Sequence, residues 1–247
     1  MNEALNSHVN SPIDTLWISV PASGGTFDAY VALPPSGSGP GLVLYQEIFG
    51  VNEHIQSVAE QYALDGFVVL APDVFWRQSP RVELGYDAAD RQQGMALAGQ
   101  LKPELLMLDL RASVDALRAL PQTAGQTAGR KLGAIGYCMG GRLAYMTAAL
   151  AEIDAAVAFY GGGIHDQLHL ASGINCRMQF HYAERDDHIS MAAVDKVRAA
   201  FANKSAEVHV YPGAAHGFNC WARASYHAPS AALAHARSLG FLAQQLF

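Results

Sequence analysis

The sequence predicts an α/β protein with a mostly parallel central sheet, an antiparallel N-terminal hairpin and helices on both faces. Its 247 residues are 51% hydrophobic, which is enough to bury a large core. From residue 41 onward, short apolar or β-branched runs alternate with longer helical patterns, as in βαβ units. Residues 42–45, Leu-Val-Leu-Tyr, lack the polar alternation of a half-exposed strand, which is typical of a strand buried on both faces.

The elements follow one another along the chain. The first two expected strands lie on either side of Pro-Ala-Ser-Gly-Gly at residues 21–25, a turn signal that predicts a hairpin. Strands are expected at residues 15–20, 30–33, 41–45, 67–71, 132–136, 155–160, 178–182 and 207–211. Helices are expected at residues 54–65, 87–101, 103–120, 140–150, 191–202 and 230–245. The Gly/Pro-rich stretches 34–41 and 121–129 are expected to be surface loops. We therefore expect an N-terminal arm, 1–14, followed by one domain, 15–247.

Composition and charge argue against a nucleic-acid-binding, membrane-spanning or disulfide-rich protein. The 16 basic and 22 acidic residues give a net charge of −6, so no electrostatic footprint for nucleic acid or an anionic membrane is expected. No apolar run approaches the ~20 residues of a membrane span, and the polar N-terminus does not resemble a signal peptide. Three cysteines argue against a disulfide scaffold. A cytoplasmic location is expected.

The segment between the expected strand 132–136 and the expected helix 140–150 carries the most informative motif. Gly136-Tyr-Cys138-Met-Gly140 has the Gly-x-Cys-x-Gly pattern of a nucleophile elbow, with cysteine in the position of serine. Flanking glycines leave room for a strained turn that aims the sulfur out of the sheet edge. A helix N-terminus there favours a thiolate and an oxyanion. The alternative interpretation is a buried, small apolar side chain on a tight turn.

A nucleophilic thiol needs a base, and the base needs a group that orients it. In the chain order of α/β-hydrolases the acid follows the nucleophile and the histidine comes last. Asp186 follows one expected strand, and His216 follows the last strand beside glycines. Asp187 remains an alternative acid. His188 lies too near the acid loop to be the preferred base, and His181, inside a strand, is expected to be structural.

The sequence resembles the dienelactone hydrolase family of α/β-hydrolases over nearly the whole chain from residue 31. The resemblance rests on QEIFGVN at 46–52, APD at 71–73, GYCMGG at 136–141, FYG at 159–161, AERDDH at 183–188 and HGFN at 216–219. Gln-Glu-x-Phe-Gly together with a cysteine elbow is specific, because a general serine esterase has neither. The resemblance implies an α/β-hydrolase fold and a triad of Cys138, Asp186 and His216.

The resemblance also assigns roles around the nucleophile. It implies that Glu47 lies next to Cys138 and controls its protonation, and that the backbone N–H groups of Ile48 and Met139 form an oxyanion hole. The position of Glu47 after the expected strand 41–45 puts it on the sheet edge that carries the elbow. The alternative for Glu47 is an acid that stabilises the N-terminus of the following helix.

Members of the family bind the carboxylate of their substrate with arginines, and Arg91 matches one such position. Its alternative is a solvated helix-face arginine that pairs with Asp87. Cys220 stands where the resemblance places a second arginine, and Arg223 is close enough in sequence to substitute for it. This departure weakens the case for dienelactone itself as the substrate.

Two bulky aromatic residues near strand ends are candidates for the pocket wall. Trp76 and Tyr137 are expected to line the substrate pocket, with ordinary core or rim packing as the alternative.

The predicted activity is hydrolysis of a small enol lactone of the dienelactone type, or another carboxylic ester, through a thioester acyl-enzyme. No metal or cofactor is expected, and the expected partner is the small-molecule substrate. Another small ester, lactone or thioester is the alternative. A third hypothesis is a thiol redox sensor with Cys176 or Cys220 as resolving partner. The resemblance implies a place in the degradation of aromatic compounds. A monomer or small homo-oligomer is expected.

Overall fold

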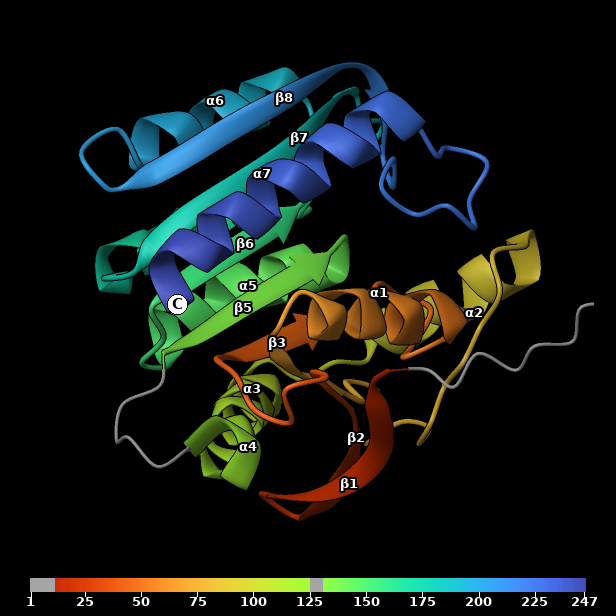
Figure 1. Cartoon of the computed structure of the whole chain (residues 1–247). Coiled ribbons are helices and arrows are strands. Elements are labelled where there is room, and N and C mark those ends of the chain that lie inside the picture. The colour runs from red at the N-terminus through yellow and green to blue at the C-terminus, as the bar shows by residue number, and fades with distance from the viewer. Residues whose placement is uncertain (1–11, 125–130) are drawn as a thin grey trace, which may run out of the picture.

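The computed structural model describes residues 12–124 and 131–247. They form an eight-stranded sheet with the strand order β1-β2-β4-β3-β5-β6-β7-β8, surrounded by helices (Figure 1). The strands are β1 (Asp14–Ala22), β2 (Gly25–Leu33), β3 (Gly41–Tyr45), β4 (Val68–Pro72), β5 (Leu132–Tyr137), β6 (Ala155–Phe159), β7 (Arg177–Arg185) and β8 (Ala206–Ala215). The helices are α1 (Glu53–Leu64), α2 (Ala88–Gly99), α3 (Pro103–Ala119), α4 (Pro121–Ala124), α5 (Met139–Leu150), α6 (Met191–Ala200) and α7 (Ala228–Leu246), with 3-10 turns η1 (Ile164–Asp166) and η2 (Leu168–Gly173).

The first two strands form the expected hairpin. β1 and β2 pair antiparallel over their whole length, from Asp14 opposite Leu33 to Ala22 opposite Gly25. β2 also pairs antiparallel with β4. The remaining neighbours, in the sheet order β4-β3-β5-β6-β7-β8, all pair parallel. This confirms the mostly parallel sheet with an antiparallel N-terminal hairpin. β1 begins within the expected arm, and residues 1–11 of that arm lie outside the described residues.

The strand order explains where a site can form. The chain runs from β3 to β4 on one side and then returns to place β5 on the other side of β3. Such a reversal opens a crevice at the carboxyl ends of the two strands, where open α/β sheets bind ligands. Glu47 follows β3 and Cys138 follows β5, so both residues lie at this crevice.

Helices cover both faces of the sheet. α1 and α7 lie on one face, and α3 and α5 lie on the other (Figure 1). The side chain of Asn52 caps α1 by accepting the N–H of Ile55, and Asp87 caps α2 in the same way. α2 packs tightly on the segment after β3, because a Cβ atom at Gly94 would lie 2.3 Å from the carbonyl oxygen of Ile48. This contact brings α2 to the carboxyl edge of the sheet.

The structure differs from the expected elements mainly at their ends. β7 and β8 continue beyond the expected strands to Arg185 and Ala215, which pair with each other across a bulge. The expected loop 121–129 begins with the short helix α4, whose first residue, Pro121, has a backbone angle suited to a helix start. Residues 125–130 of that loop lie outside the described part of the chain. Within the described residues, no helix is both long and apolar enough to cross a membrane.

Candidate active site

Cys138 occupies a strained turn between β5 and α5. Its backbone has φ 55° and ψ −118°, a conformation that costs free energy for a residue with a side chain. The flanking glycines are required by space. A Cβ atom at Gly136 would lie 2.0 Å from the carbonyl oxygen of Gly140, and one at Gly140 would lie 2.2 Å from that of Tyr45. The turn has the geometry of a nucleophile elbow, with the sulfur at the N-terminus of α5.

The extended pairing of β7 and β8 brings the acid and the histidine together. Asp186 and His216 each follow a residue of the last pair in this ladder. His216 Nδ1 donates to Asp186 Oδ2 at 2.8 Å, and His216 Nε2 lies 3.1 Å from Cys138 Sγ. The other carboxylate oxygen of Asp186 accepts the backbone N–H groups of His188 and Ile189, so the acid is fixed in orientation.

The surroundings of His216 favour its protonated form. Its side chain is 10% exposed and that of Asp186 is fully buried. Burial alone would lower the pKa of His216, but the hydrogen bonds to Asp186 and Cys138, together with their negative charge, raise it to about 10. A protonated imidazole beside the sulfur stabilises a thiolate over a neutral thiol.

Glu47 is a buried carboxyl group beside these residues. It is 1% exposed, and its Oε1 accepts a hydrogen bond from Arg223 Nη1 at 3.1 Å. Burial raises the pKa of Glu47, while the positive charges of Arg223 and His216 oppose that rise. Glu47 also retains a buried oxygen, Oε2, without a hydrogen-bond partner among the described residues.

A pocket of about 210 Å³ opens onto the sulfur. It is lined by Ile48, Phe49, Arg91, Met95, Ala98, Cys138, Met139, Arg142, Gly162, His188, His216 and Arg223. Ile48 and Met139 thus both border the pocket at the sulfur, as an oxyanion hole from their backbones would require. Three arginines and no carboxylate line this pocket in the described part of the chain, so it attracts an anion.

The arginines differ in how they are held. Arg223 is paired with Glu47 and lies over the ring of Phe49, with its guanidinium carbon 5.7 Å from the ring centroid. Arg91 Nη2 lies 3.3 Å from Nε2 of His188. The side chain of Arg142 makes no hydrogen bond or ion pair with any described residue, whereas its backbone N–H donates to the carbonyl oxygen of Cys138. Two guanidinium groups in the pocket, those of Arg91 and Arg142, therefore face no carboxylate partner from residues 12–124 and 131–247.

Arg91 belongs to the pocket and does not pair with Asp87. The Asp87 side chain accepts the backbone N–H of Asp90 and thereby caps α2. Of the two candidate acids, Asp186 reaches His216, whereas Asp187 is exposed. His181 is fully buried and has a structural role, because its ring nitrogens bond with Tyr211, Gln179 and Ser238.

The structure does not bring Trp76 or Tyr137 to the pocket, so that expectation was wrong. The Trp76 indole N–H donates to Asp109 at 3.0 Å, and its ring packs on Phe27. Tyr137 is buried against Phe159, with ring centroids 4.8 Å apart. Both side chains pack in the layer between the sheet and the helices, as the alternative interpretation expected.

Sequence reasoning missed several pocket residues. Met95 and Ala98 lie four and seven residues after Arg91 on α2, so the three share one helix face. Arg142 lies one helical turn after Cys138. Helical spacing from Arg91 and Cys138 was the signal that could have identified them. His188 carried no comparable signal, because its position depends on the loop held by Asp186.

A family model described as the dienelactone hydrolase family matches residues 27–246. The chain belongs to the dienelactone hydrolase family. Carboxymethylenebutenolidase 1 of Cupriavidus pinatubonensis is 33% identical over 223 residues, covering 90% of this chain and 93% of the relative. Carboxymethylenebutenolidase of Pseudomonas putida is 34% identical over 222 residues, covering 89% and 92%. The predicted family is confirmed, and with it a carboxylic-ester hydrolase.

Solved structures of dienelactone hydrolases agree with this fold. A Klebsiella pneumoniae protein assigned to the dienelactone hydrolases has a TM-score of 0.81 at 30% identity, covering 94% of this chain and 99% of that protein. A dienelactone hydrolase-like promiscuous phosphotriesterase from metagenomic libraries has a TM-score of 0.80 at 22% identity, covering 95% and 99%. The second likeness concerns the fold alone.

Proposed function

We propose that this dienelactone hydrolase family member opens a small, carboxylate-bearing enol lactone or ester through Cys138, His216 and Asp186. The observation that carries the proposal is the continuous chain of contacts from sulfur to imidazole to carboxylate, at 3.1 and 2.8 Å. It lies at a strained strand-to-helix turn that borders a cationic pocket.

The proposed reaction has two stages. The Cys138 thiolate attacks the ester carbonyl, and the backbone N–H groups of Ile48 and Met139 stabilise the oxyanion that develops. Loss of one such donor typically lowers the rate ~10²–10³-fold. The C–O bond to the enol then breaks and a thioester forms. His216 subsequently activates a water molecule that hydrolyses the thioester. An enol leaving group needs little protonation, which suits a thiolate nucleophile.

Glu47 is proposed to control the protonation state of Cys138. Its burial, its raised pKa and its second oxygen without a partner among the described residues support this role. An acid that acted only on the N-terminus of α1 would not need to be buried against Arg223. A carboxyl group in this environment can exchange a proton with a neighbouring thiol when substrate arrives.

A carboxylate on the substrate is supported by the arginines of the pocket. Arg91 and Arg142 have no carboxylate partner from the described chain, and Arg223 is already paired with Glu47. Cys220, where the family resemblance places an arginine, is fully buried. We therefore assign recognition of the substrate carboxylate to Arg91 and Arg142, with Arg223 positioning Glu47.

The redox-sensor hypothesis receives less support. Cys220 is buried, and burial raises the pKa of its thiol to about 11. Cys176 precedes β7 and lies at the amino end of the parallel strands, whereas Cys138 lies at the carboxyl end. Neither thiol lines the pocket of Cys138. A disulfide between Cys138 and Cys176 would have to join opposite ends of the sheet.

The test compares hydrolysis of cis- and trans-dienelactone with that of p-nitrophenyl acetate, an uncharged ester. Wild type is measured beside Cys138→Ala, Arg91→Ala and Arg142→Ala. Arg198→Ala is the matched control, because Arg198 lies on α6, pairs with Asp195 and does not line the pocket. We expect Cys138→Ala to abolish both activities. We expect Arg91→Ala and Arg142→Ala to lower kcat/KM for the dienelactones far more than for the acetate.

Other outcomes separate the alternatives. Cleavage of the acetate alone, with Arg91→Ala and Arg142→Ala indistinguishable from Arg198→Ala, would show that the elbow is right but that the substrate is a different, neutral ester. Activity that survives Cys138→Ala would overturn the mechanism.

A further inference from the structure

Arg91 is a pocket arginine whose orientation depends on one partner. It lies on α2 at the border of the pocket and is exposed. Its Nη2 atom lies 3.3 Å from Nε2 of His188, which is the only hydrogen-bond partner of this guanidinium group among the described residues. An arginine side chain has several rotatable bonds, so the contact that holds it decides where its charge lies.

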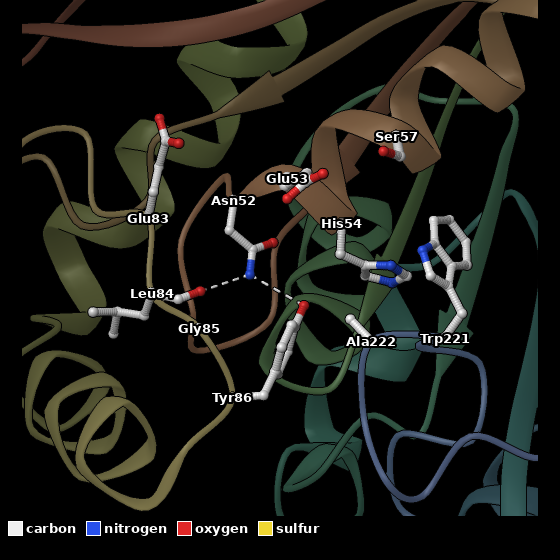
Figure 2. A pocket seen from close by; sticks show the side chains of 10 residues that line it. All are labelled: Asn52, Glu53, His54, Ser57, Glu83, Leu84, Gly85, Tyr86, Trp221 and Ala222. Atoms are coloured by element: carbon white, nitrogen blue, oxygen red, sulfur yellow. Dashed lines mark hydrogen bonds between the residues drawn. The ribbon is translucent and has the colours of Figure 1, made fainter. Parts of the chain in front are cut away.

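The helix that carries Arg91 is held by other contacts. In the segment before α2, the Asn52 amide donates to the carbonyl oxygen of Leu84 at 2.9 Å and to the Tyr86 hydroxyl at 3.1 Å. Figure 2 shows this anchor in the wall of a neighbouring hollow of about 570 Å³. Neither bond involves Arg91, so the contact with His188 concerns the arginine side chain and not the position of its helix.

The ring of His188 is held on two sides. Asp186 Oδ1 accepts the backbone N–H groups of His188 and Ile189, at 2.8 and 3.1 Å, and Ile189 is buried. These contacts fix the loop after β7. The His188 imidazole meets the ring of His216 edge to face, with centroids 4.9 Å apart and planes at 86°. His188 therefore presents an acceptor in a fixed place to Arg91.

The charge state of His188 suits this contact. Partial burial lowers the pKa of His188, and the positive charges of His216 and Arg91 lower it further, against the opposing charges of Asp186 and Asp187. The ring is therefore neutral at physiological pH. An arginine only donates hydrogen bonds, so Nε2 of His188 accepts and the proton of the neutral ring lies on Nδ1.

Two other roles fit His188 less well. A base for Cys138 must reach the sulfur, and the nitrogen that does so is Nε2 of His216, at 3.1 Å. A purely structural histidine would be bonded within the fold. Both ring nitrogens of His181 are bonded in that way, whereas the one ring nitrogen of His188 with a partner among the described residues contacts a pocket arginine.

We propose that His188 is a positioning residue that holds the guanidinium group of Arg91 toward the carboxylate of the substrate. The inference rests on the proposed function, because it requires that Arg91 binds this carboxylate. A ligand that binds a free arginine must first order a long side chain, which weakens its affinity. An arginine that is already ordered avoids this loss.

A neutral acceptor is the suitable means of holding this arginine. Glu47 also holds an arginine of the pocket, Arg223, but its carboxyl group forms an ion pair with that guanidinium. An ion pair satisfies an arginine with a negative charge from the protein itself. The imidazole of His188 orders Arg91 without such a charge, so the full positive charge stays available to an anionic substrate.

The test compares cis-dienelactone with its methyl ester, in which the carboxylate is masked, and follows lactone opening in both. His188→Phe keeps a ring against His216 but removes the acceptor, whereas His188→Gln restores an acceptor oxygen. We expect His188→Phe to raise KM for dienelactone about fivefold, the range expected for ordering one long side chain, and to change kcat less. A smaller effect is expected for the methyl ester.

Two further variants complete this comparison. We expect His188→Gln to recover most of the loss in KM, because its amide oxygen can accept from Arg91. His169→Phe is the matched control, since His169 is exposed and does not line the pocket, and it leaves KM unchanged.

A double variant separates positioning from direct contact with the substrate. If His188 acts through Arg91, adding His188→Phe to Arg91→Ala causes no further rise in KM for dienelactone. A further rise of about the size seen in the single variant would show that His188 binds the substrate itself, and would overturn the proposal.

NMR of the ring nitrogens tests the contact without a substrate. The chain has 10 histidines, and His188→Gln identifies the ¹⁵N signals of His188. At neutral pH we expect a proton on Nδ1 and none on Nε2. A proton on Nε2 would overturn the proposal, because Arg91 could not donate to that nitrogen.

Failure of this inference and failure of the proposed function give different results. Equal kcat/KM of the wild type for dienelactone and its methyl ester would show that the carboxylate is not recognised, which overturns both and is seen before any His188 variant is measured. A preference for dienelactone that Arg91→Ala abolishes and His188→Phe leaves intact would overturn this inference alone.

Discussion

His216 lies between a carboxylate and a sulfur, and both neighbours favour its charged form. The folded pKa of His216 is about 10, above the ordinary value of about 6.5. Between these two pH values, His216 therefore holds a proton in the folded state that it would lose on unfolding. Its own contribution to the free energy of unfolding is therefore fully present below pH 6.5 and is lost as the pH rises through about 10. In the proposed mechanism, the histidine becomes a base only after the sulfur has lost its negative charge to a thioester.

Asp186→Asn tests this coupling. The variant removes a negative charge and replaces an acceptor, so we expect the pKa of His216 to fall towards its ordinary value of about 6.5. We expect kcat to fall about 10⁴-fold, the size of effect seen when a triad acid is made neutral. Imidazole NMR signals measured against pH report the pKa. Asp187→Asn is the control, because Asp187 is exposed. An unchanged His216 titration in Asp186→Asn would contradict the electrostatic explanation.

Trp76 provides a second test at this scale. Trp76→Phe removes the hydrogen bond to Asp109 and part of the packing on Phe27. We expect the free energy of unfolding to fall by about 1 kcal/mol, with kcat/KM unchanged. Met95→Ala should leave the free energy of unfolding unchanged and lower kcat/KM, because Met95 is 58% exposed and lines the pocket. Urea unfolding and steady-state kinetics on both variants distinguish a core residue from a pocket residue.

At the scale of elements, the site depends on where strands stop. β3, β5, β7 and β8 run parallel, so their carboxyl ends meet at one edge and supply Glu47, Cys138, Asp186 and His216. The turn after β5 differs from the others because it must pass directly into α5. Gly140 lies against the end of β3 there, so the elbow and the neighbouring strand share one tight contact.

Gly140→Ala tests the tight contact. A Cβ atom would lie 2.2 Å from the carbonyl oxygen of Tyr45, so either β3 or the elbow must shift. Displacement of reacting groups by about 1 Å can cost ~10²-fold in rate, and we expect a loss of kcat/KM of at least that size with a lower Tm. Gly99→Ala is the control. Gly99 lies at the end of α2 with no atom within 4 Å of an added Cβ, so stability should be unchanged or slightly higher. Equal activity in the two variants would contradict the space requirement.

At the scale of the whole molecule, charge is distributed unevenly. The chain carries a net charge of −6, yet the pocket at Cys138 is lined by three arginines. An anionic substrate is therefore repelled by the molecule as a whole and attracted by one pocket. Added salt screens both effects beyond a distance of about 10 Å at 0.1 M.

Salt dependence follows from this distribution. The pocket arginines lie close to a bound anion, so we expect kcat/KM for dienelactone to fall as salt rises, while that for p-nitrophenyl acetate stays constant. Arg142→Gln should flatten the dienelactone dependence, and Arg198→Gln should leave it unchanged. A salt dependence equal for the charged and the uncharged ester would contradict carboxylate recognition by the pocket.

Local sequence patterns were sufficient to predict the elbow and the parallel sheet. The glycine spacing around Cys138 predicts the elbow because only residues without a Cβ atom fit that turn. Continuous apolar runs that alternate with helical patterns predict the parallel sheet, since both faces of β3, β4, β5 and β6 are buried. Trp76 and Tyr137 were misjudged because a position near a strand end does not determine on which side of the sheet a ring packs.

The sequence by itself determined the fold class, the family and the chain order of Cys138, Asp186 and His216. Those properties depend on periodicity, turn chemistry and motifs of a few residues. Only the tertiary structure decided that Asp186 rather than Asp187 reaches His216, because the register and bulge of β7 and β8 set that distance. It also decided that Arg142 joins Arg91 in the pocket and that Arg223 pairs with Glu47. These pairs lie far apart in the chain, and packing alone brings them together.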